Sequence, residues 1–223
     1  MPLDDPPLKD RDNFVPLVFR SLWENLPGIL MGCIIFSALA MPAFILFSIN
    51  LLGLAVVVSA LTIFPAWAAL LAYEYPIFTH HTAHWKLYWS ALSRYWLRSA
   101  VLGVVVMFPL VSVTLKLPSL NQDEIPIILW ISFAADFFIA ALVSALYLYA
   151  FPIMVRNDLG LRVTLRNAWI LIGRRPINTI GLLGMGTLFG FAVAYLSLGL
   201  LFLLPAVFGL FVVGNCEAAV QQT

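Results

Sequence analysis

The residue with the clearest chemical potential in this sequence is Asp136, an acid in the middle of a long apolar stretch. It follows Pro126 by about ten residues, which places it roughly 15 Å into a helix that begins there. A carboxylate at that depth is costly unless it meets a partner or water, or carries a proton. Two interpretations stay open: a solute or proton site inside a helix bundle, or a structural contact with Ser112, Thr114 or Lys116.

A second group of candidates lies between Leu148 and Ile180, where a block of arginines separates two apolar runs. Its members are Arg156, Arg162, Arg166, Arg174 and Arg175. Arg162 and Arg166 are one turn apart and oppose an apolar stripe, the pattern of a helix that lies on a membrane surface, and Asn157 or Asp158 is expected to cap it. These arginines are candidates for binding anionic lipid or the acidic surface of a partner protein. The alternative is that these charges only keep the segment in the cytoplasm and bind no specific ligand.

The histidines do not suggest a metal centre. His80 and His84 would share a face of a helix, with His81 beside them, but a zinc site needs three or four ligands and Glu74 is the one acid nearby. Histidines near lipid headgroups are the expectation. The chain also has no glycine-rich phosphate loop, no Ser/His/Asp or Cys/His set at a common depth and no paired carboxylates, so an enzyme is disfavoured and no cofactor is predicted.

The elements that position these residues are membrane helices. Of 223 residues, 62% are hydrophobic and 10% are charged, far from the quarter charged that is usual in soluble domains. At about 20 apolar residues for each span, the length accommodates about six. We therefore predict an all-α, polytopic protein with a tail and juxtamembrane segment (1–25) and one transmembrane domain (26–220). The expected spans are 26–47, 50–75, 97–117, 126–155, 177–196 and 199–216.

Two amphipathic helices are expected between the spans, at the membrane interface. The first follows the second span, where Trp85, Trp89, Leu92 and Trp96 recur on one helical face. The second is the segment that carries Arg162 and Arg166. Tryptophan suits this position because its ring is buried in acyl chains while its N–H stays hydrated.

The distribution of basic residues predicts the orientation. Eleven of the 12 Lys and Arg residues fall in the N-terminal segment or in the connections after the second and fourth spans, and Lys116 alone falls on the opposite side. The positive-inside rule then places both termini and both amphipathic helices in the cytoplasm. The formal net charge of +1 gives no field that would attract a nucleic acid.

Two short segments resemble each other inside the chain. Residues 73–77 and 149–153 share the pattern Tyr-x-aromatic-Pro-Ile, and each precedes an amphipathic helix and a further span. An internal duplication would explain the match. Two helices that leave a membrane through tyrosine and proline could also look alike by chance, so both explanations stay open.

The chain resembles the YesL-like family of bacterial membrane proteins. Residues 62–70, around Pro65, are similar to that family's Thr-Ile-Gly-Pro-Ala-x-Ala-Ala-Leu signature, with Phe64 in place of the glycine. A second block of the family is matched by Pro152 with Arg156, by residues 164–168 around Asn167, and by Asn178 with Thr179. The resemblance implies a bacterial inner-membrane protein of several helices, often encoded beside carbohydrate-uptake systems and without an established activity.

These residues favour two functions, and a sensor of membrane or ligand state is a third that nothing in the residues separates from the first. The first is an accessory or interaction component of a transport system, carbohydrate uptake being the setting that the resemblance implies, with the cytoplasmic amphipathic helices as its contact surface. The second is a small solute or lipid permease that uses a cavity near Asp136. Membrane lipids, and for the first function subunits of a transport complex, are the expected partners.

Overall fold

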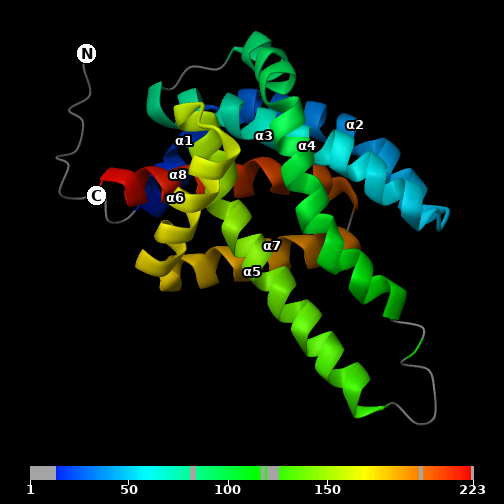
Figure 1. The fold of residues 1–223 in the computed structure, drawn as a ribbon. Coiled ribbons are helices and arrows are strands. Elements are labelled where there is room, and N and C mark those ends of the chain that lie inside the picture. The colour runs from blue at the N-terminus through cyan, green and yellow to red at the C-terminus, as the bar shows by residue number, and fades with distance from the viewer. Residues whose placement is uncertain (1–13, 81–83, 117–118, 120–125, 196–197, 222–223) are drawn as a thin grey trace, which may run out of the picture.

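The structure is a computed structural model that describes residues 14–80, 84–116, 119, 126–195 and 198–221 (Figure 1). Every long element in these residues is an α-helix. In chain order they are α1 (Phe14–Glu24), α2 (Leu26–Ser48), α3 (Leu52–His80), α4 (Trp85–Lys116), α5 (Ile127–Asn157), α6 (Leu161–Arg174), α7 (Pro176–Tyr195), the short 3₁₀ helix η3 (Leu198–Phe202) and α8 (Leu204–Gln221). The expected tail, 1–13, lies outside the described residues.

Among the described residues, five helices are long and apolar enough to cross a membrane: α2, α3, α4, α5 and α7. The predicted all-helical fold is confirmed, and five such helices are compatible with the predicted membrane protein. The expected tight turn between the first two spans is also present, where Asn50 adopts a positive φ of 61° between α2 and α3. Asparagine tolerates this left-handed conformation better than most residues, which explains why the turn lies here.

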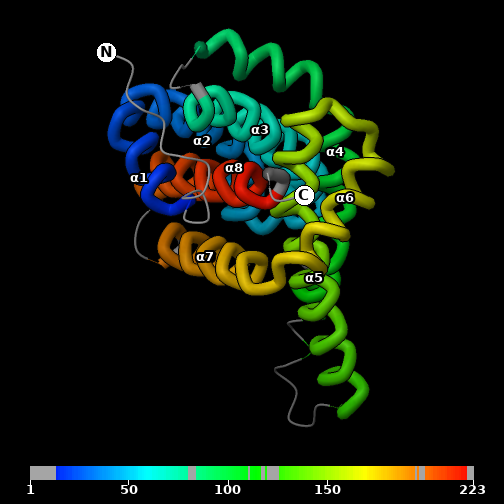
Figure 2. The backbone as a smooth tube through the Cα atoms, turned by 90° about the vertical axis from the view of Figure 1, so that its left-hand side faces the viewer, coloured from blue at the N-terminus to red at the C-terminus, as the bar shows by residue number. Residues whose placement is uncertain are grey.

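Helix α8 differs from the other apolar helices because it is short and enclosed. Its apolar part, Leu204–Ala219, covers about 24 Å at about 1.5 Å per residue, less than the roughly 30 Å of a hydrocarbon core. Leu210, Val212 and Cys216 are buried in it. Figure 2 shows α8 with α1, α2 and α3 on one side and α7 on the other. The last helix therefore forms the centre of the bundle.

The two connections that were expected to resemble each other are built differently. Instead of a separate interfacial helix before the third span, α4 runs unbroken from Trp85 to Lys116. No proline or glycine interrupts its first four turns, and Tyr88 and Tyr95 on its buried face hold it against the bundle. In the second connection α6 ends and α7 begins at Pro176, and proline suits the first turn of a helix because no N–H is needed there.

The tryptophan stripe of α4 faces away from the protein. Trp85, Trp89 and Trp96 are exposed, whereas Tyr88 is buried against α3 and donates from its hydroxyl to the carbonyl of Ala66 at 3.0 Å. The Trp96 ring nitrogen donates to the carbonyl of Leu61 at 3.1 Å. An exposed ring that is anchored through its N–H, as Trp96 is, fits an apolar surround with polar groups at one edge.

Helices α4 and α5 form an arm at one side of the molecule. The first half of α5 extends beyond the other helices in both views (Figures 1 and 2). Its large apolar side chains are exposed, among them Ile127, Ile131 and Phe138, as is Phe108 on α4. An apolar surface of this size needs a lipid or protein cover, which fits the membrane-embedded class.

The large ring of Phe64, in the position before Pro65, fits against α4 because residue 103 is a glycine. A Cβ built on Gly103 of α4 would lie 2.4 Å from Cδ2 of the Phe64 ring, so the ring occupies the space that a side chain at 103 would take. On its other side Phe64 stacks on Phe151 with ring centroids 6.3 Å apart. Glycine at 103 therefore permits the close contact of α3 and α4.

Candidate functional sites

The acid at Asp136 is part of a polar cluster between α4 and α5. Lys116 Nζ lies 2.5 Å from Asp136 Oδ2 and donates to Ser132 Oγ at 2.6 Å. Ser112 Oγ donates to the same carboxylate, 3.1 Å from Oδ2 and 3.2 Å from Oδ1. The expected partners Ser112 and Lys116 are therefore both in contact with Asp136, whereas Thr114 bonds to the carbonyl of Val111 at 2.9 Å.

This cluster is closed rather than open to a ligand. The exposed fractions of the Lys116 and Asp136 side chains are 28% and 13%, and both charges are compensated within the cluster. A charged pair of this kind avoids the cost of an isolated charge in an apolar surround. Its immediate effect is to join the C-terminal turn of α4 to the first third of α5.

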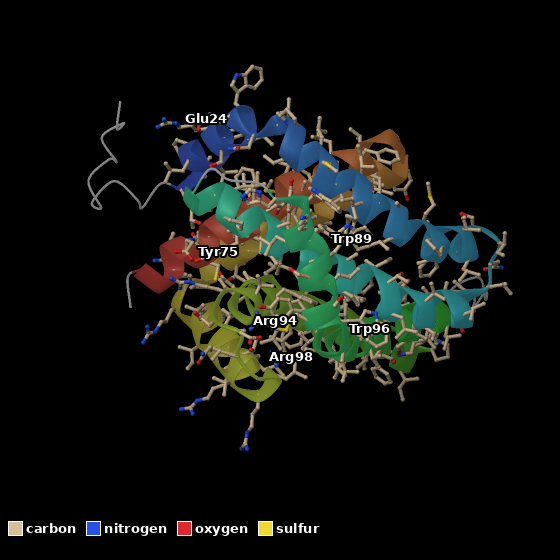
Figure 3. All side chains as sticks on the ribbon, turned by 90° about the horizontal axis from the view of Figure 1, so that it is seen from above. Glu24, Tyr75, Trp89, Arg94, Trp96 and Arg98 are labelled. Atoms are coloured by element: carbon tan, nitrogen blue, oxygen red, sulfur yellow. The ribbon has the colours of Figure 1, made fainter. Side chains whose placement is uncertain are left out.

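The arginine block divides into an inward and an outward set. Arg156 Nε lies 2.9 Å from Glu217 Oε1 and donates to the Tyr75 hydroxyl at 3.0 Å. Tyr75 in turn donates to Glu217, and Figure 3 shows Tyr75 beside α8. Arg175 donates from Nη2 to the carbonyl of Ala218 at 3.1 Å. These two arginines are structural, because they fix the C-terminal half of α8.

The other three arginines, Arg162, Arg166 and Arg174, are exposed on α6. Among the residues that the structure describes, none of the three makes an ion pair or a side-chain hydrogen bond. Large apolar side chains are exposed between them. Together they make the α6 outer face, which consists of Arg162, Val163, Arg166, Trp169, Ile170 and Arg174. The opposite side of α6 is anchored on the bundle through Thr164, Ala168 and Leu171.

A third charged group links α4 to the corner between α5 and α6. Arg94 Nη2 lies 2.6 Å from Asp158 Oδ2, and Arg98 Nη1 lies 2.9 Å from Asp158 Oδ1. Figure 3 shows both arginines on the side of α4 that faces this corner. The hydrogen bond from Arg94 holds the pKa of Asp158 below its ordinary 3.8, and Arg98 adds to this effect, while partial desolvation opposes it.

The expectation that Asn157 or Asp158 caps α6 is wrong. The residue before α6 is Gly160, with no side-chain cap, and Asp158 instead ends α5 in a left-handed conformation with φ 49°. The physical reason is competition: two guanidinium groups offer the carboxylate stronger, charge-assisted hydrogen bonds than the main-chain N–H groups of a helix start.

Three polar residues of the core were missed by sequence reasoning: Glu74, Tyr75 and Glu217. Glu74 and Tyr75 follow the second apolar run and seemed to lie at the interface, but α3 continues through Pro76 to His80 and keeps Glu74 buried. Glu217 ends an apolar run in the same way. For Glu217 the available signal is Arg156 at the end of another apolar run, since a buried acid needs a cation.

The remaining sequence candidates are placed as follows. Pro65 on α3 and Pro152 on α5 are buried inside their helices, and Asn167 is half-buried on α6. His84 is exposed just before α4, and His81 lies outside the described residues. Within the described parts of the chain, no group of three or more His, Cys, Asp or Glu could hold a metal ion.

The fold and these clusters define a class: a polytopic helical membrane protein whose charged side chains gather mainly around α6, the start of α4 and the ends of α5 and α8. No family model, curated protein or solved structure matches the chain.

Proposed function

We propose that this protein is an accessory component of a transport complex in a bacterial inner membrane, and that the α6 outer face is its docking surface. The observation that carries the proposal is the division of the arginine block. Arg156 and Arg175 are bound to residues of α8. The other three, Arg162, Arg166 and Arg174, are exposed with apolar side chains between them.

A face of this composition suits a protein partner. Arginine and tryptophan are the residues that most often dominate binding energy at interfaces, and a guanidinium binds a carboxylate in a bidentate fashion. Trp169 has 56% of its surface exposed, so it is available as an anchor. The partner side is expected to carry carboxylates around an apolar depression.

The setting of the proposal comes from the sequence. The similarity of residues 62–70 to the YesL-like signature supports a bacterial membrane protein linked to carbohydrate uptake, and the basic residues support both termini in the cytoplasm, which requires an even number of spans. With α8 counted as the sixth crossing, the chain would end on the side where α1 begins. The proximity of α1 to the middle of α8, where Phe14 packs on Phe211 with centroids 6.3 Å apart, supports this arrangement.

The experiment is co-purification from the native membrane at native expression, in mild detergent, with the wild-type protein and two triple variants. Arg162→Gln/Arg166→Gln/Arg174→Gln is expected to lose the transporter subunits at least tenfold. The matched variant with lysine at the same three positions keeps the positive charge but loses the bidentate guanidinium, so we expect it to retain part of the transporter subunits. Recovery of the wild-type protein alone, or equal recovery of subunits with the glutamine variant, would contradict the proposal.

A small permease that acts at Asp136 is the second candidate, and the observation in its favour is an acid on a membrane helix beside three polar side chains. The closed ion pair with Lys116 weakens it, because a solute would have to displace the lysine. Uptake of a solute into proteoliposomes that is lost in Asp136→Asn and kept in Asp136→Glu would support this function. Absence of uptake with the wild-type protein would remove it.

A further inference from the structure

Glu74 is an acid in the centre of the bundle whose carboxyl group has no hydrogen-bond partner among the described residues. It lies on α3 with 0% of its surface exposed, and neither of its oxygens reaches a donor. The side chain points at α8: a Cβ built on Gly209 would lie 2.1 Å from Oε2 of Glu74. The missing side chain at 209 therefore makes the space that the carboxyl group fills.

The titratable side chains near Glu74 are its chain neighbour Tyr73 on α3, Cys33 on α2 and Tyr88 on α4. Each could donate a hydrogen bond to a carboxylate. Each donates instead to a main-chain carbonyl: Tyr73 to Gly28 at 3.0 Å, Tyr88 to Ala66 at 3.0 Å and Cys33 to Leu201 at 3.4 Å. The donors around Glu74 are therefore already used.

The charged groups of the neighbouring helices are used elsewhere as well. On α8 the first titratable residues after Gly209 are Cys216 and Glu217, about two turns along the helix. Glu217 is bound by Arg156 of α5 and by Tyr75. The cation that α5 brings to the core thus compensates Glu217 and leaves Glu74 without a counter-ion.

An ionised carboxylate in this position would be far more costly than a neutral acid, because it is shielded from bulk water and has neither a donor nor a cation among the described residues. A metal ion would need several oxygen ligands, and the described residues include no group of three or more His, Cys, Asp or Glu that could hold one. A bound proton neutralises the carboxylate and so avoids the cost of a buried charge. We propose that Glu74 is a proton-binding site, which carries a proton while α3 and α8 are in contact and releases it only when that contact opens to water.

The proposal goes beyond the docking function, since it concerns the core of the bundle and not α6. It gives the protein a means to couple its conformation to proton concentration, as intramembrane acids do in many transport proteins. Glutamine at position 74 keeps the size of the neutral acid and cannot release a proton, so Glu74→Gln should fold and remain in the closed state. Ionisation of the wild-type residue should loosen the packing around Gly209.

Infrared spectroscopy of the full-length protein in lipid nanodiscs tests the proton directly. The chain has four glutamates, Glu24, Glu74, Glu124 and Glu217, so carboxyl ¹³C labelling of glutamate separates their bands from those of aspartate. We expect the carbonyl band of a protonated acid at neutral pH, shifted by the label, lost in Glu74→Gln and kept in Glu217→Gln. Absence of that band from the wild-type spectrum, or its survival in Glu74→Gln, overturns the proposal.

Hydrogen exchange tests the coupling in the same samples. Raising the pH should remove the infrared band and, after correction for the intrinsic pH dependence of exchange, increase amide exchange in α8 around Gly209 at least tenfold. In Glu74→Gln the corrected exchange should stay constant. Loss of the band without a change in exchange would contradict the link to the α3–α8 contact, and equal exchange changes in both proteins would show that Glu74 does not control it.

Discussion

Charged residues in this molecule are distinguished by what they touch rather than by their position in the sequence. Arg156 and Arg162 are six residues apart, yet one is bound to Glu217 inside the bundle and the other is exposed on α6. Arg98 is bound to Asp158. Because an exposed pair contributes little and an uncompensated charge in an apolar surround costs much, the effect of each substitution depends on the partner left behind.

Asp158 should make the stability depend on pH in the acid range. Its folded pKa lies below its ordinary value of 3.8 because Arg94, and then Arg98, favour the carboxylate. The contribution is therefore complete above pH 3.8 and is lost as the pH falls through the lower folded value. We expect the difference in melting temperature between the wild-type protein and Asp158→Asn to be largest near neutral pH and to shrink below 3.8. A difference that is constant with pH would contradict this assignment.

The pair between Lys116 and Asp136 predicts a non-additive double substitution. Lys116→Met leaves a carboxylate without its cation, and Asp136→Leu leaves an ammonium without its anion, so each alone should lower the melting temperature in detergent by several degrees. The double variant should recover most of the loss, because it removes both charges together. The melting temperature of each of the four proteins is measured by heating samples and using size-exclusion chromatography to find the fraction that still elutes as intact protein. Additive losses would show that the two side chains do not act as a pair.

At the scale of single helices, the apolar runs predicted which segments are helical better than they predicted where each helix begins and ends. The runs at 26–47 and 126–155 correspond closely to α2 and α5, because about 20 apolar residues leave a segment few alternatives to a membrane helix. The continuity of α4 could not be predicted, since the change from polar to apolar composition near Leu97 coincides with no break in the backbone. The partners of Asp136 were predicted, whereas Glu74 was missed because its burial depends on the packing of α8 against α3.

The contact between α3 and α4 depends on a glycine that the sequence does not single out. In Gly103→Ala the new Cβ would collide with the Phe64 ring, whose Cδ2 lies 2.4 Å from the ideal Cβ position. We expect a loss of about 1–3 kcal/mol in the free energy of unfolding, the usual effect of overpacking. Phe64→Leu in the same chain should recover part of it. Unfolding by denaturant in mixed micelles provides the measurement.

The control for that experiment is Gly181→Ala on α7, where a Cβ would meet nothing within 4 Å. Alanine has the higher helix propensity, so this variant should be as stable as the wild-type protein or slightly more so. Equal losses at both positions would show that the effect does not come from the Phe64 contact. A loss at Gly103 alone supports the packing explanation.

At the scale of the whole molecule, the charged residues and the apolar arm lie in different parts of the structure. Arg94, Arg98, Arg156 and Arg175 are joined to the ends of α5 and α8, while the first half of α5 extends away from them as an apolar limb (Figure 1). Lys116 belongs to that limb and is paired there. This asymmetry is what a membrane requires, because basic residues are retained on one side and apolar surface is buried in lipid.

Cysteine accessibility in cells tests the orientation that we propose. Cys33 and Cys216 are 0% and 1% exposed, so the folded protein has a low background with a membrane-impermeant maleimide. With basic residues retained in the cytoplasm, Arg166→Cys on α6 should react only after the cells are made permeable. Gln122→Cys, in the connection between α4 and α5, should react in intact cells. The opposite pattern would mean that the α6 outer face is outside the cell, where it could not dock on a cytoplasmic subunit.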